Sequence, residues 1–139
     1  MNKSPVPQGN YIPATRLGNL IYTSGMTPRD NGVLIYRGKV MLSEPIDIYK
    51  EAVRLATGNA LAAAQSVLSN KENLEKIIAL TVYIAAEEGF QKHSMLADFA
   101  SEYLYEKLGN QGISSRSAVG VASLPKDATV EIQLVASLR

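Results

Sequence analysis

The segment at residues 128–137 most constrains how this chain can fold. Apolar and polar side chains alternate along it from Val130 to Ser137, which is typical of a β-strand with one buried face. Residues 117–122 are small and β-prone, and the Leu-Pro-Lys-Asp segment at 124–127 is suited to a turn, because proline presets φ and aspartate can bond the nearby backbone. The pattern predicts two strands joined by a turn.

Arg116 lies at the start of the first of these two strands. Positions 118, 120 and 122 share its face of the strand and hold Ala, Gly and Ala. A guanidinium beside such small side chains has room to form a bidentate pair with the carboxylate of a small ligand. The alternative is a strand arginine that is solvated or paired with a surface acid, because polar strand residues usually face water. The residues alone leave both interpretations open.

Glu131 is the second candidate, and its position depends on strand register. If residue 121 pairs with residue 128, Glu131 shares a face with Arg116. If residue 122 pairs with residue 128, the two side chains fall on opposite faces. A shift of one residue therefore creates or destroys a site containing both, and the sequence leaves both registers open.

The middle of the chain predicts two helices and a long strand. Apolar residues recur at helical spacing over 46–68, after Pro45, and again over 90–108, before Gly109. Residues 74–86 are β-branched and apolar nearly throughout, which predicts a central strand covered on both faces.

With short strands at 14–17, 20–24 and 33–36, the order is βββ-α-β-α-ββ. We expect an α+β fold in which two helices pack on one face of a mixed sheet. Residues 1–139 are expected to form a single domain. A sheet with one bare face also favours an oligomer.

Composition excludes several kinds of site. The chain has no cysteine and one histidine, His93, which excludes disulfides, thiolate zinc sites, a cysteine nucleophile and any scheme needing two imidazoles in one chain. We expect no metal and no cofactor. His93 has no evident partner, and we interpret it as structural or exposed. Asn59 falls on the inner face of the first helix, where a hydrogen-bonded buried amide is expected.

Charge and hydropathy limit the kinds of partner that we expect for this chain. The formal net charge is +1, from 14 basic and 13 acidic residues, and no basic stripe is present, so nucleic acid is not an expected partner. Residues 1–9 lack the apolar core of a signal peptide, and the apolar run at 77–86 is too short for a membrane span. We expect a soluble cytoplasmic protein.

Two pairs of segments carry a resemblance to a known family. RSAVGVASLP at 116–125 and VEIQLVA at 130–136 resemble the C-terminal signature of the Rid/YjgF family, also labelled L-PSP endoribonuclease-like. GNY at 9–11 and LGNLIYTSG at 17–25 resemble its opening. The resemblance spans nearly the whole chain. It implies the chorismate-mutase-like fold of that family, in a homotrimer whose three sheets form a barrel-like centre with ligand clefts between subunits.

The resemblance also implies hydrolysis of small reactive 2-enamine and 2-imine acids to 2-keto acids and ammonia. Arg116 would clamp the substrate carboxylate, and main-chain groups beside Ala118 would position the reacting end. Glu131 would orient or activate water as a general base. Tyr11 from the adjacent subunit would help to close the site, and the backbone at Gly25 would lie along the cleft.

Two departures from the family pattern keep other functions open. Archetypal deaminases have a cysteine where this chain has Ala118, and the second acid of their VEIE string is Gln133 here. The alternative is therefore a non-catalytic trimer that binds small carboxylates or regulates a partner. A third possibility is the endoribonuclease and translation inhibitor of the family label. The near-neutral charge and the lack of a histidine pair argue against it, because phosphodiester cleavage generally needs cationic phosphate contacts.

Overall fold

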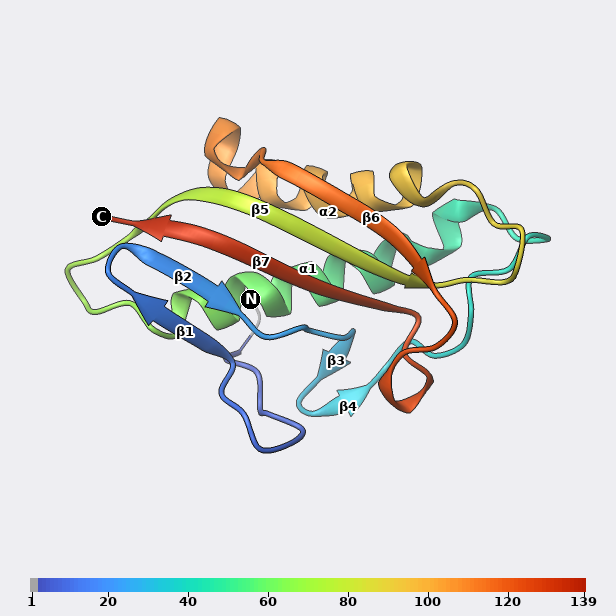
Figure 1. Ribbon diagram of the computed structural model, residues 1–139, viewed down its shortest axis with the longest axis horizontal. Helices are drawn as coiled ribbons and strands as arrows, with labels where there is room; N and C mark the ends of the chain where they lie inside the picture. Colours follow the sequence, from blue (N-terminus) through green and yellow to red (C-terminus); the bar gives the residue numbers. More distant parts are fainter. Residues whose placement is uncertain (1–2) are drawn as a thin grey trace.

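The computed structural model describes residues 3–139, which form one five-stranded sheet with two long helices on one side (Figure 1). The strand order is β1-β2-β7-β5-β6. The strands of this sheet are β1 (Ala14–Leu17), β2 (Leu20–Thr23), β5 (Leu74–Ala85), β6 (Ser115–Val121) and β7 (Val130–Leu138). The helices are α1 (Lys50–Gln65) and α2 (His93–Leu108), and β3 (Arg29–Asp30) and β4 (Val33–Leu34) form a separate two-stranded ribbon.

The predicted α+β class and mixed sheet are confirmed. Each expected helix and strand is present, with its ends moved by a few residues. The first helix begins with the 3-10 turn Ile46–Tyr49, and its α-helical part ends at Gln65. The third expected strand, at 33–36, is shortened to β4, and β3 was not among the expected strands. Two further 3-10 turns, Gly109–Gly112 and Pro125–Asp127, follow α2 and β6.

The predicted hairpin between β6 and β7 is wrong. β5 lies between these two strands, parallel to β6 and antiparallel to β7, so β6, drawn in orange, and β7, drawn in red, flank it (Figure 1). The connection carries the chain past the end of β5, through a 3-10 turn in which Lys126 and Asp127 have φ of 58° and 65°. The turn residues were correctly interpreted, but the strands that they connect are not neighbours.

The two faces of the sheet differ in burial. On the helix side of β7, Val130, Ile132 and Ala136 are fully buried, whereas Glu131 and Gln133 on the other side are partly exposed. β5 follows the same pattern over most of its length, because Ala79, Thr81 and Tyr83 on its open face are only partly buried. The expectation that β5 is covered on both faces is therefore not met within this chain. Its many β-branched residues reflect strand propensity as well as burial.

Alanines bring α1 close to the sheet. Its helix residues facing the core are fully or almost fully buried: Ala52, Ala56, Ala60, Ala63 and Ala64. Asn59 is 8% exposed, and its Nδ2 donates to the carbonyl oxygens of Thr27 at 3.1 Å and Arg29 at 2.9 Å. The prediction of a hydrogen-bonded buried amide is confirmed, and the amide ties the segment around β3 to α1.

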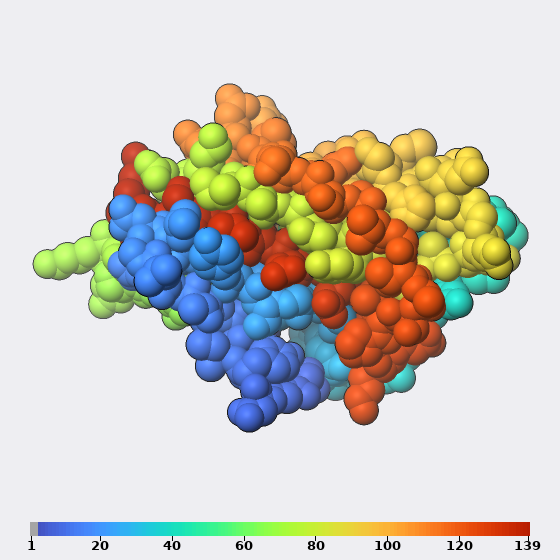
Figure 2. Space-filling view, in the orientation of Figure 1, coloured from blue at the N-terminus to red at the C-terminus, as the bar shows by residue number. Residues whose placement is uncertain are grey.

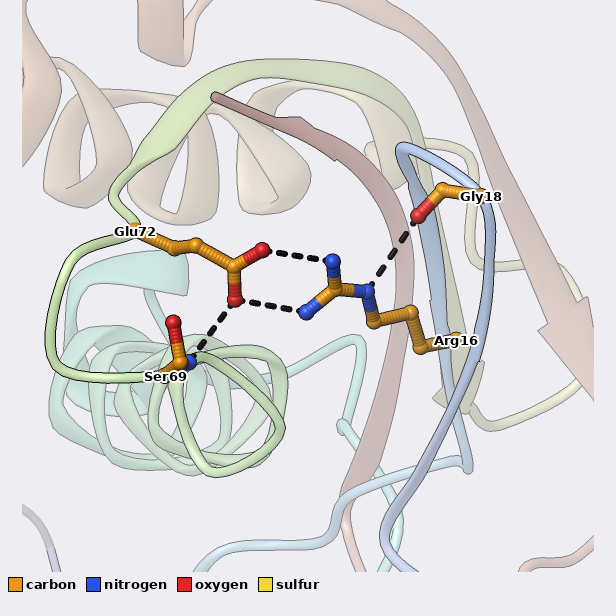
Figure 3. Close-up of polar contacts among 4 residues, drawn as sticks. All are labelled: Arg16, Gly18, Ser69 and Glu72. Carbon is orange, nitrogen blue, oxygen red and sulfur yellow. Dashed lines mark hydrogen bonds and ion pairs between the residues drawn. The ribbon is translucent and has the colours of Figure 1, made fainter.

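A bidentate ion pair joins the β1 edge of the sheet to the connection before β5 (Figure 3). Arg16 Nη1 and Nη2 donate to Glu72 Oε1 and Oε2 at 2.6 and 2.5 Å, and Arg16 Nε donates to the Gly18 carbonyl. The Ser69 backbone N–H donates to Glu72 Oε1 at 2.8 Å. The hydrogen bonds from Arg16 and then from Ser69 lower the pKa of Glu72 from 4.5 to about 2.

This pair predicts an acid-dependent contribution to stability. Because the pKa of Glu72 is lower in the folded chain, its contribution is complete above the unfolded pKa and is lost as the pH falls towards 2. We expect Glu72→Gln to lower the free energy of unfolding at neutral pH, and the difference from wild type to vanish in acid. Urea unfolding across this pH range measures it. Glu44→Gln, at an exposed glutamate outside the pair, is the control. A difference that is constant with pH would contradict the assignment.

Candidate functional site

The strand register places Arg116 and Glu131 on opposite faces of the sheet. Leu80 of β5 pairs with Arg116 on one side and Leu134 on the other. Tyr83 pairs in the same way with Val119 and Glu131. Residues level with one another across a sheet point to the same side, so Arg116 lies on the helix side and Glu131 on the open side. Neither hairpin register applies, and one chain does not bring the two side chains together.

Arg116 is bound to α2. Its Nη1 donates to Asp98 Oδ1 at 2.8 Å and to Ser101 Oγ at 3.0 Å. Its Nη2 donates to the carbonyl oxygen and Oγ of Ser94 at 3.1 and 2.8 Å. The side chain is 19% exposed. Of the two interpretations left open by the sequence, this structure shows the arginine paired with a surface acid. The interaction fastens the edge strand β6 to α2.

The small residues after Arg116 make room for the start of α2. Ala118 packs against the core, and a Cβ added to Gly120 would lie 2.6 Å from His93 Nε2. The His93 ring also packs edge-on against Phe90, with the ring centroids 4.9 Å apart. Of the two expected roles of His93, structural or exposed, this packing favours the structural one. The start of α2 covers the small residues beside Arg116.

This close packing predicts the effect of adding one methyl group. Gly120→Ala would push the His93 ring away, and we expect the free energy of unfolding to fall by about 1–3 kcal/mol, as in other overpacked sites. Thermal or urea unfolding measures the change. His93→Ala in the same chain should remove most of the added cost, since the clashing ring is absent. Equal costs of Gly120→Ala in the two backgrounds would contradict the contact.

Glu131 lies on the open face against the backbone of Gly25. A Cβ added to Gly25 would overlap the Glu131 carboxylate, with Cγ at 2.9 Å, so only glycine lets the carboxylate lie there. Burial raises the pKa of Glu131 above its ordinary value of 4.5. On the same face Tyr83 donates to Gln133 Oε1 at 3.4 Å. A half-buried carboxyl with a raised pKa has the properties required of a general base.

Tyr11 and Gly25 line a cavity of about 350 Å³ between the N-terminal arm and α1. The arm, residues 3–11, curls around the ring of Tyr11, whose hydroxyl accepts a hydrogen bond from the Gln8 N–H at 3.1 Å. Figure 2 shows a hollow between this blue segment and the lighter blue β3–β4 segment. Tyr11 is 45% exposed, so the ring is available to a neighbouring molecule.

The predicted site residues therefore form two groups. Tyr11, Gly25 and Glu131 lie around the end of β2 and the open face, and Arg116 and Ala118 lie at the β6 edge beneath α2. Sequence reasoning missed Arg29, which lines the cavity, and the α2 partners of Arg116. The one sequence signal for this cavity was the predicted position of Asn59 on the inner face of the first helix, because Asn59 lines the cavity.

The described part of the chain offers neither a metal-binding cluster nor a membrane-spanning helix. No group of three or more His, Cys, Asp or Glu within residues 3–139 could hold a metal ion. None of the helices in this range is long and apolar enough to cross a membrane.

The fold, together with the sequence segments that resemble the Rid/YjgF family, defines a YjgF-like α+β protein. Residues 1–138 match the family described as endoribonuclease L-PSP, and the chain belongs to this family. The predicted family resemblance and fold are thus confirmed.

Relatives and solved structures agree with this assignment. The chain is 32% identical to a RutC family protein of Haemophilus influenzae over 96% of this chain and 91% of that protein. It is 26% identical to a 2-iminobutanoate/2-iminopropanoate deaminase of Dermatophagoides farinae, over 95% and 88%. Among solved structures, Atu1372 of Agrobacterium tumefaciens, of unknown function, has a TM-score of 0.84 at 32% identity, covering 96% and 86%. The YjgF gene product of E. coli has a TM-score of 0.69 at 25% identity, covering 97% and 93%.

Proposed function

We propose that this protein is a hydrolase that converts small 2-enamine and 2-imine acids to 2-keto acids and ammonia. The observation that carries the proposal is Glu131, a half-buried carboxyl with a raised pKa on an open sheet face. A family relative named as a 2-iminobutanoate/2-iminopropanoate deaminase supports the choice of substrate. Such imines arise from amino-acid-metabolising enzymes, so we propose a cytoplasmic location for the activity.

We propose a homotrimer with the site in a cleft between two copies. The open sheet face carries partly exposed residues such as Tyr22, Tyr83 and Val119, and an uncovered face of this kind favours association. Within one chain, Arg116 and Ala118 lie apart from Tyr11, Gly25 and Glu131. Each cleft would therefore combine Arg116 and Ala118 of one copy with the other three residues of its neighbour. An interface that repeats around a closed ring forms one such site for each subunit.

The chemistry in this cleft requires few groups. An enamine substrate would first tautomerise to the imine. Glu131 would accept a proton from the water that attacks the imine carbon and would pass this proton to the nitrogen, which gives a carbinolamine. Loss of ammonia from that intermediate leaves the keto acid. Arg116 would hold the substrate carboxylate, which takes the place of Asp98 and Ser94 on its Nη atoms. The main chain beside Ala118 would position the reacting end, and Tyr11 and Gly25 would close and line the cleft.

The first test measures ammonia or keto-acid formation from freshly generated 2-aminoacrylate/2-iminopropionate. We expect wild type to accelerate the reaction, and Glu131→Gln to reduce the acceleration by roughly 100-fold through loss of the base. Wild-type activity should fall as the pH is lowered through the pKa of Glu131, which lies above 4.5. Arg116→Ala should raise KM through loss of the carboxylate clamp, while Arg37→Ala, at an exposed arginine, should match wild type. No acceleration over buffer would refute the proposed activity.

A mixing experiment tests the composite site. If each cleft takes Arg116 from one copy and Glu131 from the next, unfolding and refolding Arg116→Ala together with Glu131→Gln restores intact clefts. Random assembly of an equal mixture should give about a quarter of the wild-type sites. Each variant refolded alone is the control. A mixture no more active than its components would show that the groups act within one chain, and light scattering checks the trimer itself.

A second candidate is a non-catalytic module that binds small carboxylates. The observations that favour it are Ala118 in place of the archetypal cysteine and an Arg116 already engaged by α2. Saturable binding of pyruvate or 2-oxobutanoate without turnover of the imines would support this function over hydrolysis.

A further inference from the structure

Arg29 is a partly buried cation that the proposed reaction does not use. It lines the cavity beside the N-terminal arm. Its Nε donates to Thr27 Oγ1 at 3.2 Å and its Nη1 donates to the Gly32 carbonyl at 2.8 Å. Within residues 3–139, Arg16, Arg54 and Arg116 each pair with a carboxylate, whereas no ion pair involves Arg29. Its Nη2 donates no hydrogen bond in this part of the chain.

The guanidinium is held in place by the backbone around it. Asn59 of α1 bonds the carbonyl oxygens of Thr27 and Arg29. The tight turn after β3 has Asn31 and Gly32 at φ of 51° and 79°, which aims the Gly32 carbonyl at Nη1. Asp30 also borders the cavity. No ion pair within residues 3–139 joins its carboxylate to Arg29.

The rest of the cavity is suited to an acid with an apolar part. Its volume of about 350 Å³ is within the range of small-molecule sites. One part of its lining is apolar, with side chains from the arm, the segment after β2 and α1: Pro5, Val6, Met26 and Leu55. Lys3 adds a second positive charge. A fixed guanidinium with no ion-pair partner among residues 3–139, close to a group of apolar side chains, suits a carboxylate attached to a small hydrocarbon group.

We propose that this cavity binds a small organic acid with an apolar side chain. The carboxylate bonds Arg29, and the apolar part lies among Met26, Leu55 and the N-terminal arm. The site goes beyond the proposed hydrolysis, because neither Arg116 nor Glu131 contributes to it. It shares the lining residues Tyr11 and Gly25 with the proposed cleft, so a bound acid lies directly beside the backbone that supports Glu131.

The test is a calorimetric titration of the full-length chain with 4-methyl-2-oxopentanoate, a keto acid that carries no imine. We expect saturable binding of the acid and none of its uncharged amide. Arg29→Gln should weaken binding at least tenfold, by loss of a charged hydrogen bond. Arg37→Gln, which removes an exposed arginine outside the cavity, is the matched control and should bind like wild type.

Further variants separate this site from the proposed cleft. Leu55→Phe should weaken binding, because the larger side chain fills the cavity while Arg29 stays in place. This variant tests the site even if Arg29→Gln does not fold. Arg116→Gln removes carboxylate binding at the proposed cleft and should leave a saturable binding phase that depends on Arg29. The inference is overturned if wild type shows no saturable binding, or if Arg116→Gln abolishes binding that Arg29→Gln retains. Because no turnover is measured, failure of the proposed hydrolysis does not affect this result.

Discussion

The pairing of β5 with β6 on one edge and β7 on the other is the constraint on which the rest of this structure depends. A parallel partner requires a crossover, and α2 supplies it between β5 and β6. An antiparallel partner on the opposite edge then returns the chain to β2. The same pairing decides which side chains share a face. It directs Arg116 towards α2 and Glu131 towards the open side.

The sequence predicted most of the elements and the buried faces of β7 and α1 well, because these are local properties. Alternation from Val130 to Ser137 reports which side chains are buried, and the alanines of α1 report close packing against a sheet. Alternation carries no information about which strand lies alongside. Two adjacent strands with a turn between them were therefore assigned to a hairpin, although β5 separates them.

The sequence named candidate residues for the site but did not predict how they are arranged. The family resemblance pointed to Arg116 and Glu131, but their surroundings come from distant segments: α2 for the arginine and Gly25 for the glutamate. Arg29 has no local signal, since its turn is simply polar in sequence. Its significance comes from the lack of a carboxylate partner within residues 3–139, which depends on the tertiary fold.

The two arginines differ in what a ligand carboxylate must displace. At Arg116, it competes with Asp98 and Ser94, which are tethered in the same chain and so act at a high effective concentration. At Arg29, Nη2 donates no hydrogen bond within residues 3–139, and the hydrogen bonds of Nε and Nη1 already fix the guanidinium. Ligand binding at Arg29 therefore costs little further side-chain ordering. Binding at Arg116 requires the arginine to exchange its hydrogen bonds with α2 for those with the ligand. A free acid should therefore occupy Arg29 first, and in the proposed reaction a substrate would reach Arg116 only where a neighbouring copy supplied further contacts.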